Sequence, residues 1–198
     1  MAVLCIFGAS TTWGAWDSEK GGWVNRLRLF LEKNDYDIDV YNLGVSGDNT
    51  NNILERFKVE CNARMPTIIM FSLGDNDSAK GSEVYVPADK FKENLNKLIK
   101  LSKKFTDKII FVGTKGIDES RTNPVYWDSS VSYKLENIEE YDGIVQEICK
   151  KNDIPYVNIP RLKNEDFEDG VHPNEKGHEK IFLKVKDFLS KNSFKKSC

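Results

Sequence analysis

The segment Ala2-Val-Leu-Cys-Ile-Phe7 is continuously apolar and runs directly into the small and polar stretch Gly8-Ala-Ser-Thr-Thr12. A short apolar run of this kind, bounded by a turn signal, is typical of a strand covered on both faces. Such strands belong to parallel sheets that carry helices on each side. Gly8 therefore marks the carboxyl end of a first buried strand, and Ser10 follows it closely.

Four more apolar runs repeat this pattern along the chain. Between and after them, apolar residues recur at spacings of three and four, which predicts helices with one face on a sheet. The repeated strand–helix order predicts an α/β fold with a parallel sheet. The five candidate strands are Ala2–Phe7, Ile38–Asn42, Thr67–Leu73, Lys108–Gly113 and Pro155–Ile159.

Size and composition indicate one domain, residues 1–198, with an ordinary balance of apolar and charged residues. The net charge of −2 argues against a nucleic-acid partner. No apolar stretch approaches the roughly 20 residues that cross a membrane, and the first segment lacks the basic lead of a signal peptide. We therefore expect a cytoplasmic protein without a membrane span.

The cysteines do not indicate a metal site. Cys5, Cys61, Cys149 and Cys198 are scattered, without CxxC spacing, and the chain has only two histidines. Reduced structural thiols fit this pattern better than zinc ligands do.

Parallel sheets bind ligands beyond the carboxyl ends of their strands, so the loops that follow the strands are the places to search for chemistry. Small residues around Ser10 let the backbone turn sharply and present the hydroxyl group. The alternative is a Ser/Thr-rich loop that cradles a phosphate with its N–H groups.

The next two loops contain candidate hydrogen-bond donors. Gly47 can bring its N–H close to a ligand without obstruction, although Asp48 or Asn49 can equally cap the next helix. Asn76 offers a neutral amide that suits a developing oxyanion, whereas an Asx turn is the structural alternative.

His172 is the candidate base, since His178 falls inside the last predicted helix, which Pro173 is expected to open. A structural or exposed role is expected for His178. Asp169 lies three residues before His172, so a tight turn can place the carboxylate beside the imidazole and fix its tautomer. Without that neighbour, His172 would be interpreted as a helix-entry residue.

Taken together, these loops resemble the SGNH, or GDSL-type, hydrolase family, whose blocks supply a serine, a glycine, an asparagine and a histidine. The resemblance covers nearly the whole chain. The matching segments are Phe7-Gly8-Ala9-Ser10, Ser46-Gly47-Asp48, Gly74-Asp75-Asn76-Asp77 (GxND) and Asp169-Gly170-Val171-His172-Pro173 (DxxH).

The resemblance implies a flavodoxin-like three-layer α/β/α sandwich with a five-stranded sheet of order 2-1-3-4-5. It also implies hydrolysis of esters or thioesters without metal or cofactor. The first block departs from the family pattern, because Ala9 stands where an aspartate is usual. Any hydrogen bond by which that aspartate supports neighbouring loops is absent here.

The expected enzyme is a serine ester hydrolase that forms an acyl-enzyme on Ser10. The expected oxyanion donors are the N–H groups of Ser10 and Gly47 and the Asn76 amide. The substrate is expected to be a small acyl or acetyl ester, with carbohydrate O-deacetylation or thioester hydrolysis as alternatives. A non-catalytic phosphate- or nucleotide-binding module is the alternative from another class. Candidate substrate contacts are the aromatic residues after the nucleophile and in the long segment 115–133, namely Trp13, Trp16, Tyr126 and Trp127.

Overall fold

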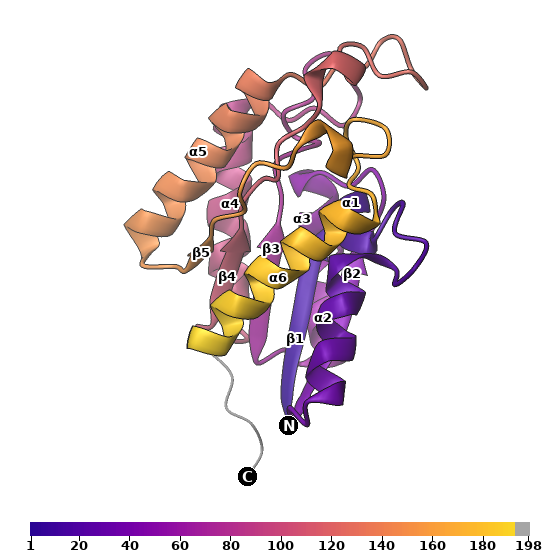
Figure 1. The fold of residues 1–198 in the computed structure, drawn as a ribbon. Coiled ribbons are helices and arrows are strands. Elements are labelled where there is room, and N and C mark those ends of the chain that lie inside the picture. Colours follow the sequence, from indigo (N-terminus) through magenta and orange to yellow (C-terminus); the bar gives the residue numbers. More distant parts are fainter. Residues whose placement is uncertain (193–198) are drawn as a thin grey trace.

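The computed structural model describes residues 1–192 and contains a five-stranded parallel sheet of order β2-β1-β3-β4-β5 (Figure 1). This is the predicted order, with β1 between β2 and β3. The register sets Gly8 at the end of β1 opposite Gly44 of β2 and Ser72 of β3, so three strands end at one edge. The strands are β1 (Ala2–Gly8), β2 (Ile38–Gly44), β3 (Ile68–Ser72), β4 (Ile109–Val112) and β5 (Tyr156–Val157).

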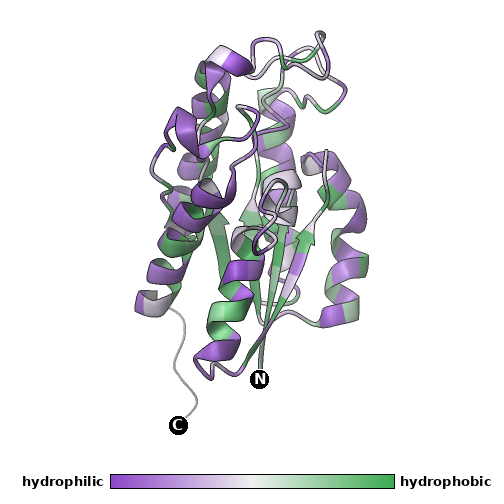
Figure 2. Ribbon diagram, turned by 45° about the vertical axis from the view of Figure 1, so that its right-hand side comes forward, coloured by the Kyte–Doolittle hydropathy of each residue, from purple (hydrophilic) through white to green (hydrophobic). Residues whose placement is uncertain are grey.

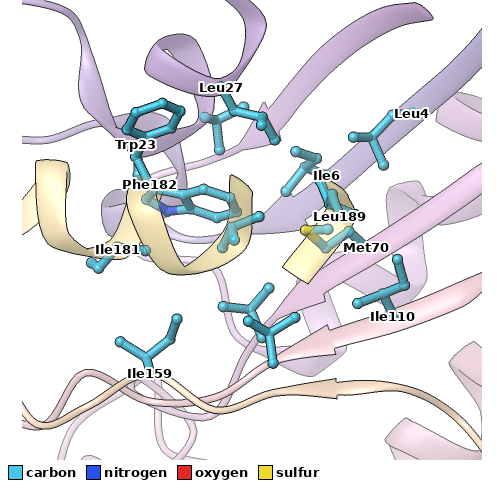
Figure 3. Close-up of a cluster of buried hydrophobic side chains, with 14 of the residues drawn as sticks. Leu4, Ile6, Trp23, Leu27, Met70, Ile110, Ile159, Ile181, Phe182 and Leu189 are labelled. Carbon is cyan, nitrogen blue, oxygen red and sulfur yellow. The ribbon is translucent and has the colours of Figure 1, made fainter. Parts of the chain in front are cut away.

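Helices cover both faces of the sheet, which confirms the three-layer sandwich. Two of them, α2 and α6, share one hydrophobic cluster with the sheet, and α3, α4 and α5 share another. Figure 3 shows side chains of the first cluster converging from strands and helices. The helices are α1 (Ser10–Trp13), α2 (Gly22–Lys33), α3 (Thr50–Arg64), α4 (Ala88–Ser102), α5 (Leu135–Asn152) and α6 (Glu175–Asn192), with the 3-10 turns η1 (Glu119–Arg121) and η2 (Asn164–Asp166).

Strand β1 explains why its sequence is apolar without interruption. Leu4 and Ile6 pack into the cluster on the α2 and α6 side, and Cys5 and Phe7 pack into the opposite cluster. All four side chains are fully buried. In Figure 2 most of the strand ribbon is accordingly green, whereas purple residues alternate along the helices. Because successive strand residues point to opposite faces, a strand covered on both sides has no polar position.

Three local features differ from the sequence prediction. The fifth strand is shorter than expected and spans Tyr156–Val157. The segment after β1, expected as a loop, forms the short helix α1, which begins at Ser10. The last helix begins at Glu175 and not at Pro173. Its cap is Asn174, whose side-chain oxygen accepts hydrogen bonds from the N–H groups of Lys176 and Gly177 at 3.1 and 3.2 Å.

The cysteines within the described residues are buried and reduced. Burial raises the pKa of the Cys5, Cys61 and Cys149 thiols to about 12, so they stay protonated at neutral pH. Cys198 lies outside the described residues. No helix in the segment 1–192 is long and apolar enough to cross a membrane.

Candidate active site

Two glycines allow the chain to place Ser10 at the edge of the sheet. A Cβ atom on Gly8 would lie 2.8 Å from the carbonyl oxygen of Ser72, and one on Gly44 would lie 2.2 Å from the backbone nitrogen of Trp13. Only residues without a side chain allow α1 to pack this closely against the strand ends. Asn42 then anchors the helix, because its amide donates to the carbonyl of Thr12 at 2.9 Å.

Ser10, His172 and Asp169 form a continuous hydrogen-bonded chain. Nε2 of His172 lies 2.8 Å from Oγ of Ser10, although the two residues are 162 positions apart. Nδ1 of the same ring lies 2.7 Å from Oδ2 of Asp169. A carboxylate only accepts hydrogen bonds, so Nδ1 carries the proton and Nε2 accepts from the serine hydroxyl. This is the arrangement in which an imidazole can deprotonate a nucleophile.

The turn from Asp169 to His172 fixes the carboxylate. Oδ1 of Asp169 accepts from the backbone N–H groups of Val171 and His172 at 2.9 and 2.8 Å. Gly170 makes the turn possible with a φ of 95°. Burial on its own would raise the pKa of Asp169, but the hydrogen bonds from His172 and Val171 and the charge of His172 outweigh it and hold the pKa below its usual value.

Asn76 and Gly47 line one surface groove together with Ser10 and His172. This active-site groove has a volume of about 400 Å³, and its other walls come from Ser46, from residues 81–84 and from part of the segment 127–133. Asn76 donates one amide hydrogen to the carbonyl of Asp48 at 2.9 Å, and an amide has a second hydrogen to offer. Tyr133 fixes the orientation of that amide, since its hydroxyl donates to Oδ1 of Asn76 at 3.0 Å.

Tyr133 was not among the predicted site residues. Its sequence neighbourhood gives no signal, because a tyrosine at the end of a long loop looks the same whether it packs or binds. The structure also shows Asn49 as the N-cap of α3, so the loop after β2 both caps a helix and brings Gly47 to the groove.

The loop after β3 is held from both sides. Asp77 accepts from the N–H and the hydroxyl of Thr50 at 2.9 and 2.6 Å, and burial raises the pKa of this carboxyl to about 6. Asp75 accepts from the hydroxyl of Thr114 at 3.0 Å and forms an ion pair with the buried Lys115. These contacts, with the anchoring of α1, support the loops around Ser10 although Ala9 has no polar side chain.

The four aromatic residues predicted to contact the substrate line three different hollows. Trp127 lines the active-site groove, and its ring centroid lies 6.0 Å from that of His172. Tyr126 packs edge-on against Trp127 and, with Trp16, lines a second hollow of about 330 Å³ next to Asp169. Trp13 lines a third hollow with Arg28 of α2 that shares no residue with the active-site groove, so the structure does not bring Trp13 to the candidate site.

His178 is a buried structural residue. Its Nδ1 accepts from the N–H of Trp23 at 3.2 Å, and its Nε2 donates to the carbonyl of Ala15 at 2.8 Å. Burial lowers the pKa of His178 to about 4, so the ring is neutral at pH 7. Of the two roles that the sequence left open for this residue, the structure selects the structural one.

Solved structures with the same fold include hydrolases. A lipase/acylhydrolase from Enterococcus faecalis superposes with a TM-score of 0.83 at 21% identity, and the match covers 100% of both chains. An acetylxylan esterase from Geobacillus stearothermophilus superposes with a TM-score of 0.75 at 19% identity, over 100% of this chain and 96% of that one. Three further matches are that esterase with a serine, a histidine or an aspartate replaced, each described as a catalytic mutant.

No curated protein sequence matches the chain. The sequence pattern of the GDSL-like lipase/acylhydrolase family, however, matches residues 4–185, which is nearly the whole length and includes all the candidate residues. The chain therefore belongs to the GDSL-like lipase/acylhydrolase family and is a serine ester hydrolase.

Proposed function

We propose that Ser10 is the nucleophile of this hydrolase, that His172 is its general base and acid, and that Asp169 orients His172. The observation that carries the proposal is the 2.8 Å contact between Oγ of Ser10 and Nε2 of His172. A nucleophile and a base at hydrogen-bond distance, with a third group holding the base, are the requirements of this chemistry.

The reaction proceeds in two steps. Ser10 attacks the ester carbonyl while His172 takes its proton, and the alcohol then leaves with that proton. The negative oxygen of the tetrahedral intermediate is held by the N–H groups of Ser10 and Gly47 and by the amide of Asn76. Water, deprotonated by His172, then hydrolyses the acyl-enzyme and restores Ser10.

The esterase variants described as catalytic mutants support these roles. They replace a serine, a histidine and an aspartate, the residue types proposed here. In that esterase the aspartate precedes the histidine by three positions, as Asp169 precedes His172.

The substrate we propose is a small acyl or acetyl ester, and an acetylated carbohydrate is the second candidate. Trp127 supports the second candidate, since its side chain is 45% exposed in the groove wall and offers a face on which a sugar can stack. Glu83 and Asp128 also line the groove and would repel a polyanionic thioester carrier. Thioester hydrolysis is therefore the weaker alternative.

A panel of p-nitrophenyl esters of increasing chain length, with acetylated sugars beside them, tests the substrate proposal. We expect kcat/KM to be highest for acetyl esters and to fall as the acyl chain lengthens. A maximum at long acyl chains would contradict it. Labelling with a fluorophosphonate probe tests the nucleophile separately, because a phosphate-binding module has no activated serine and would not react.

Asn76→Ala is expected to lower kcat by about 10²–10³-fold and to change KM much less, because the amide is needed mainly when the oxyanion forms. Steady-state kinetics on p-nitrophenyl acetate measures this. Asn96→Ala is the matched control, since Asn96 is an exposed asparagine of α4 that donates to the carbonyl of Lys92. An unchanged kcat in Asn76→Ala would remove Asn76 from the oxyanion hole.

A further inference from the structure

Trp16 has a backbone conformation that is unusual for a large side chain. Its φ is 66°, in the left-handed region that bulky residues rarely adopt. Such a conformation persists only where the surrounding structure imposes it, and it is concentrated at functional sites. Trp16 lies three residues beyond α1, the helix that begins with Ser10.

Both neighbours of Trp16 are fixed by buried contacts. The carbonyl of Ala15 accepts from Nε2 of His178 in α6 at 2.8 Å. The carboxylate of Asp17 is buried and binds the guanidinium of Arg26 in α2 through two hydrogen bonds, at 2.6 and 3.0 Å. The two helices therefore hold the chain on each side of Trp16 and determine where its indole ring points.

The indole ring reaches Asp169. Nε1 of Trp16 lies 3.1 Å from Oδ2 of Asp169, which is the oxygen that also lies 2.7 Å from Nδ1 of His172. The other oxygen, Oδ1, accepts from two backbone N–H groups. The carboxylate thus accepts four hydrogen bonds, and Trp16 supplies the only one of these four that comes from a distant part of the sequence.

We propose that Trp16 is a positioning residue of the active site. Its indole N–H holds the Asp169 carboxylate in the orientation in which it binds His172. The same hydrogen bond weakens the electrostatic attraction between the carboxylate and the Nδ1 proton of His172. The inference rests on the proposed function, in which His172 is the base. It gives Trp16 a different role from a substrate contact.

The physical reason is the sharing of one oxygen between two donors. An indole N–H is always a donor and never an acceptor, so this hydrogen bond favours the ionised carboxylate. Without it, the full charge of Oδ2 acts on His172, and the protonated imidazole becomes more stable in the free enzyme. The base would then remain protonated, and inactive, up to a higher pH.

The other titratable and charged groups around the Asp169 carboxylate keep their charges when phenylalanine replaces Trp16. Arg121 and Glu168 line the same hollow, and the Arg121 guanidinium binds Asp118 at 2.7 Å. The phenol of Tyr133 lies near Asp169, which contributes to raising its pKa after the larger effect of burial. Replacing a tryptophan by phenylalanine changes no charge among these groups.

Trp13 provides a matched control. It is a tryptophan three positions earlier, it is 59% exposed where Trp16 is 52% exposed, and it lines a separate hollow with Asn42 and Arg28. A phenylalanine at either position keeps an aromatic ring and removes only the indole N–H and part of the ring surface.

The test compares Trp16→Phe and Trp13→Phe with the unmodified protein in pH profiles of kcat and kcat/KM for p-nitrophenyl acetate. Losing one hydrogen bond to the carboxylate acts on the imidazole only indirectly, which corresponds to a shift of about half a pH unit. For Trp16→Phe we expect the acidic limb of kcat/KM to move up by about that amount, and kcat to fall several-fold with little change in KM. Trp13→Phe should show neither effect.

Each other outcome has a definite meaning. A raised KM with an unmoved acidic limb would make Trp16 a substrate contact and overturn the proposal, as would profiles identical to those of Trp13→Phe. If the unmodified protein neither hydrolyses esters nor reacts with a fluorophosphonate, the proposed function fails. The proposal is then judged from the NMR resonance of the ring N–H of His172, which should shift in Trp16→Phe and not in Trp13→Phe; an unmoved resonance would overturn it.

If Trp16→Phe does not fold, hydrogen exchange of the indole N–H groups in the unmodified protein tests the proposal. The indole N–H of Trp16 should exchange much more slowly than that of Trp13, because it is bonded to Asp169. Equal, fast exchange of both indoles would overturn the proposal.

Discussion

Ser10→Ala is expected to lower kcat for ester hydrolysis by about 10⁴–10⁶-fold without unfolding the protein. The substitution removes one oxygen atom, and with it the group that becomes covalently bonded to the acyl carbon. His172→Ala should cost a similar factor, because the hydroxyl without its base is a weak nucleophile. The double variant should lose no more than either single variant, since the two groups act as one unit.

Steady-state kinetics and fluorophosphonate labelling measure this loss, and thermal unfolding monitors the fold. Ser18→Ala is the matched control, because Ser18 is an exposed serine whose hydroxyl donates to Glu175 at 2.8 Å. If Ser10→Ala retained the activity and the labelling of the control, another residue would be the nucleophile.

Asp17→Asn is expected to lower the free energy of unfolding by about 3–5 kcal/mol, because it leaves the buried Arg26 guanidinium without its main counter-charge. Both side chains of this pair are almost inaccessible to solvent, with exposed fractions of 0% for Asp17 and 4% for Arg26. Glu179 also binds the guanidinium, but from a position that is 38% exposed. For a chain of this length the melting temperature should fall by roughly 10 °C.

Thermal and urea unfolding measure the effect, with the exposed Asp107→Asn as the control. The unmodified protein should also lose stability in acid. Burial acts to raise the pKa of Asp17, but the hydrogen bonds from Arg26 and from the backbone of Lys20 and Gly22 outweigh it and lower the pKa. The contribution of Asp17 is therefore complete above the ordinary carboxyl pKa of about 4 and disappears as the pH falls through the lower, folded value. Equal stability of Asp17→Asn and the control would refute this account.

The positions of the strands followed from local chemistry, whereas their order in the sheet was implied by the family resemblance. A strand such as Ala2–Gly8, with Leu4 and Cys5 buried on opposite faces, must be apolar throughout, so its sequence identifies it. The helix α1 could not be predicted in this way, because its four residues, Ser10–Trp13, are too few to show a helical periodicity. The prediction also failed at the start of α6, where Pro173 was the expected first-turn residue but the Asn174 side chain caps the helix, which therefore begins at Glu175.

The sequence by itself determined the candidate triad, since only two histidines exist and one of them, His172, follows an aspartate by three residues. The parallel order of strands then required the loops of Ser10 and His172 to meet at one edge. The tertiary structure alone decided which supporting side chains reach them. Trp16, Tyr133 and Lys115 make contacts with residues 40 or more positions away. Such contacts depend on how separate loops pack against each other, and no local pattern in a sequence encodes that packing.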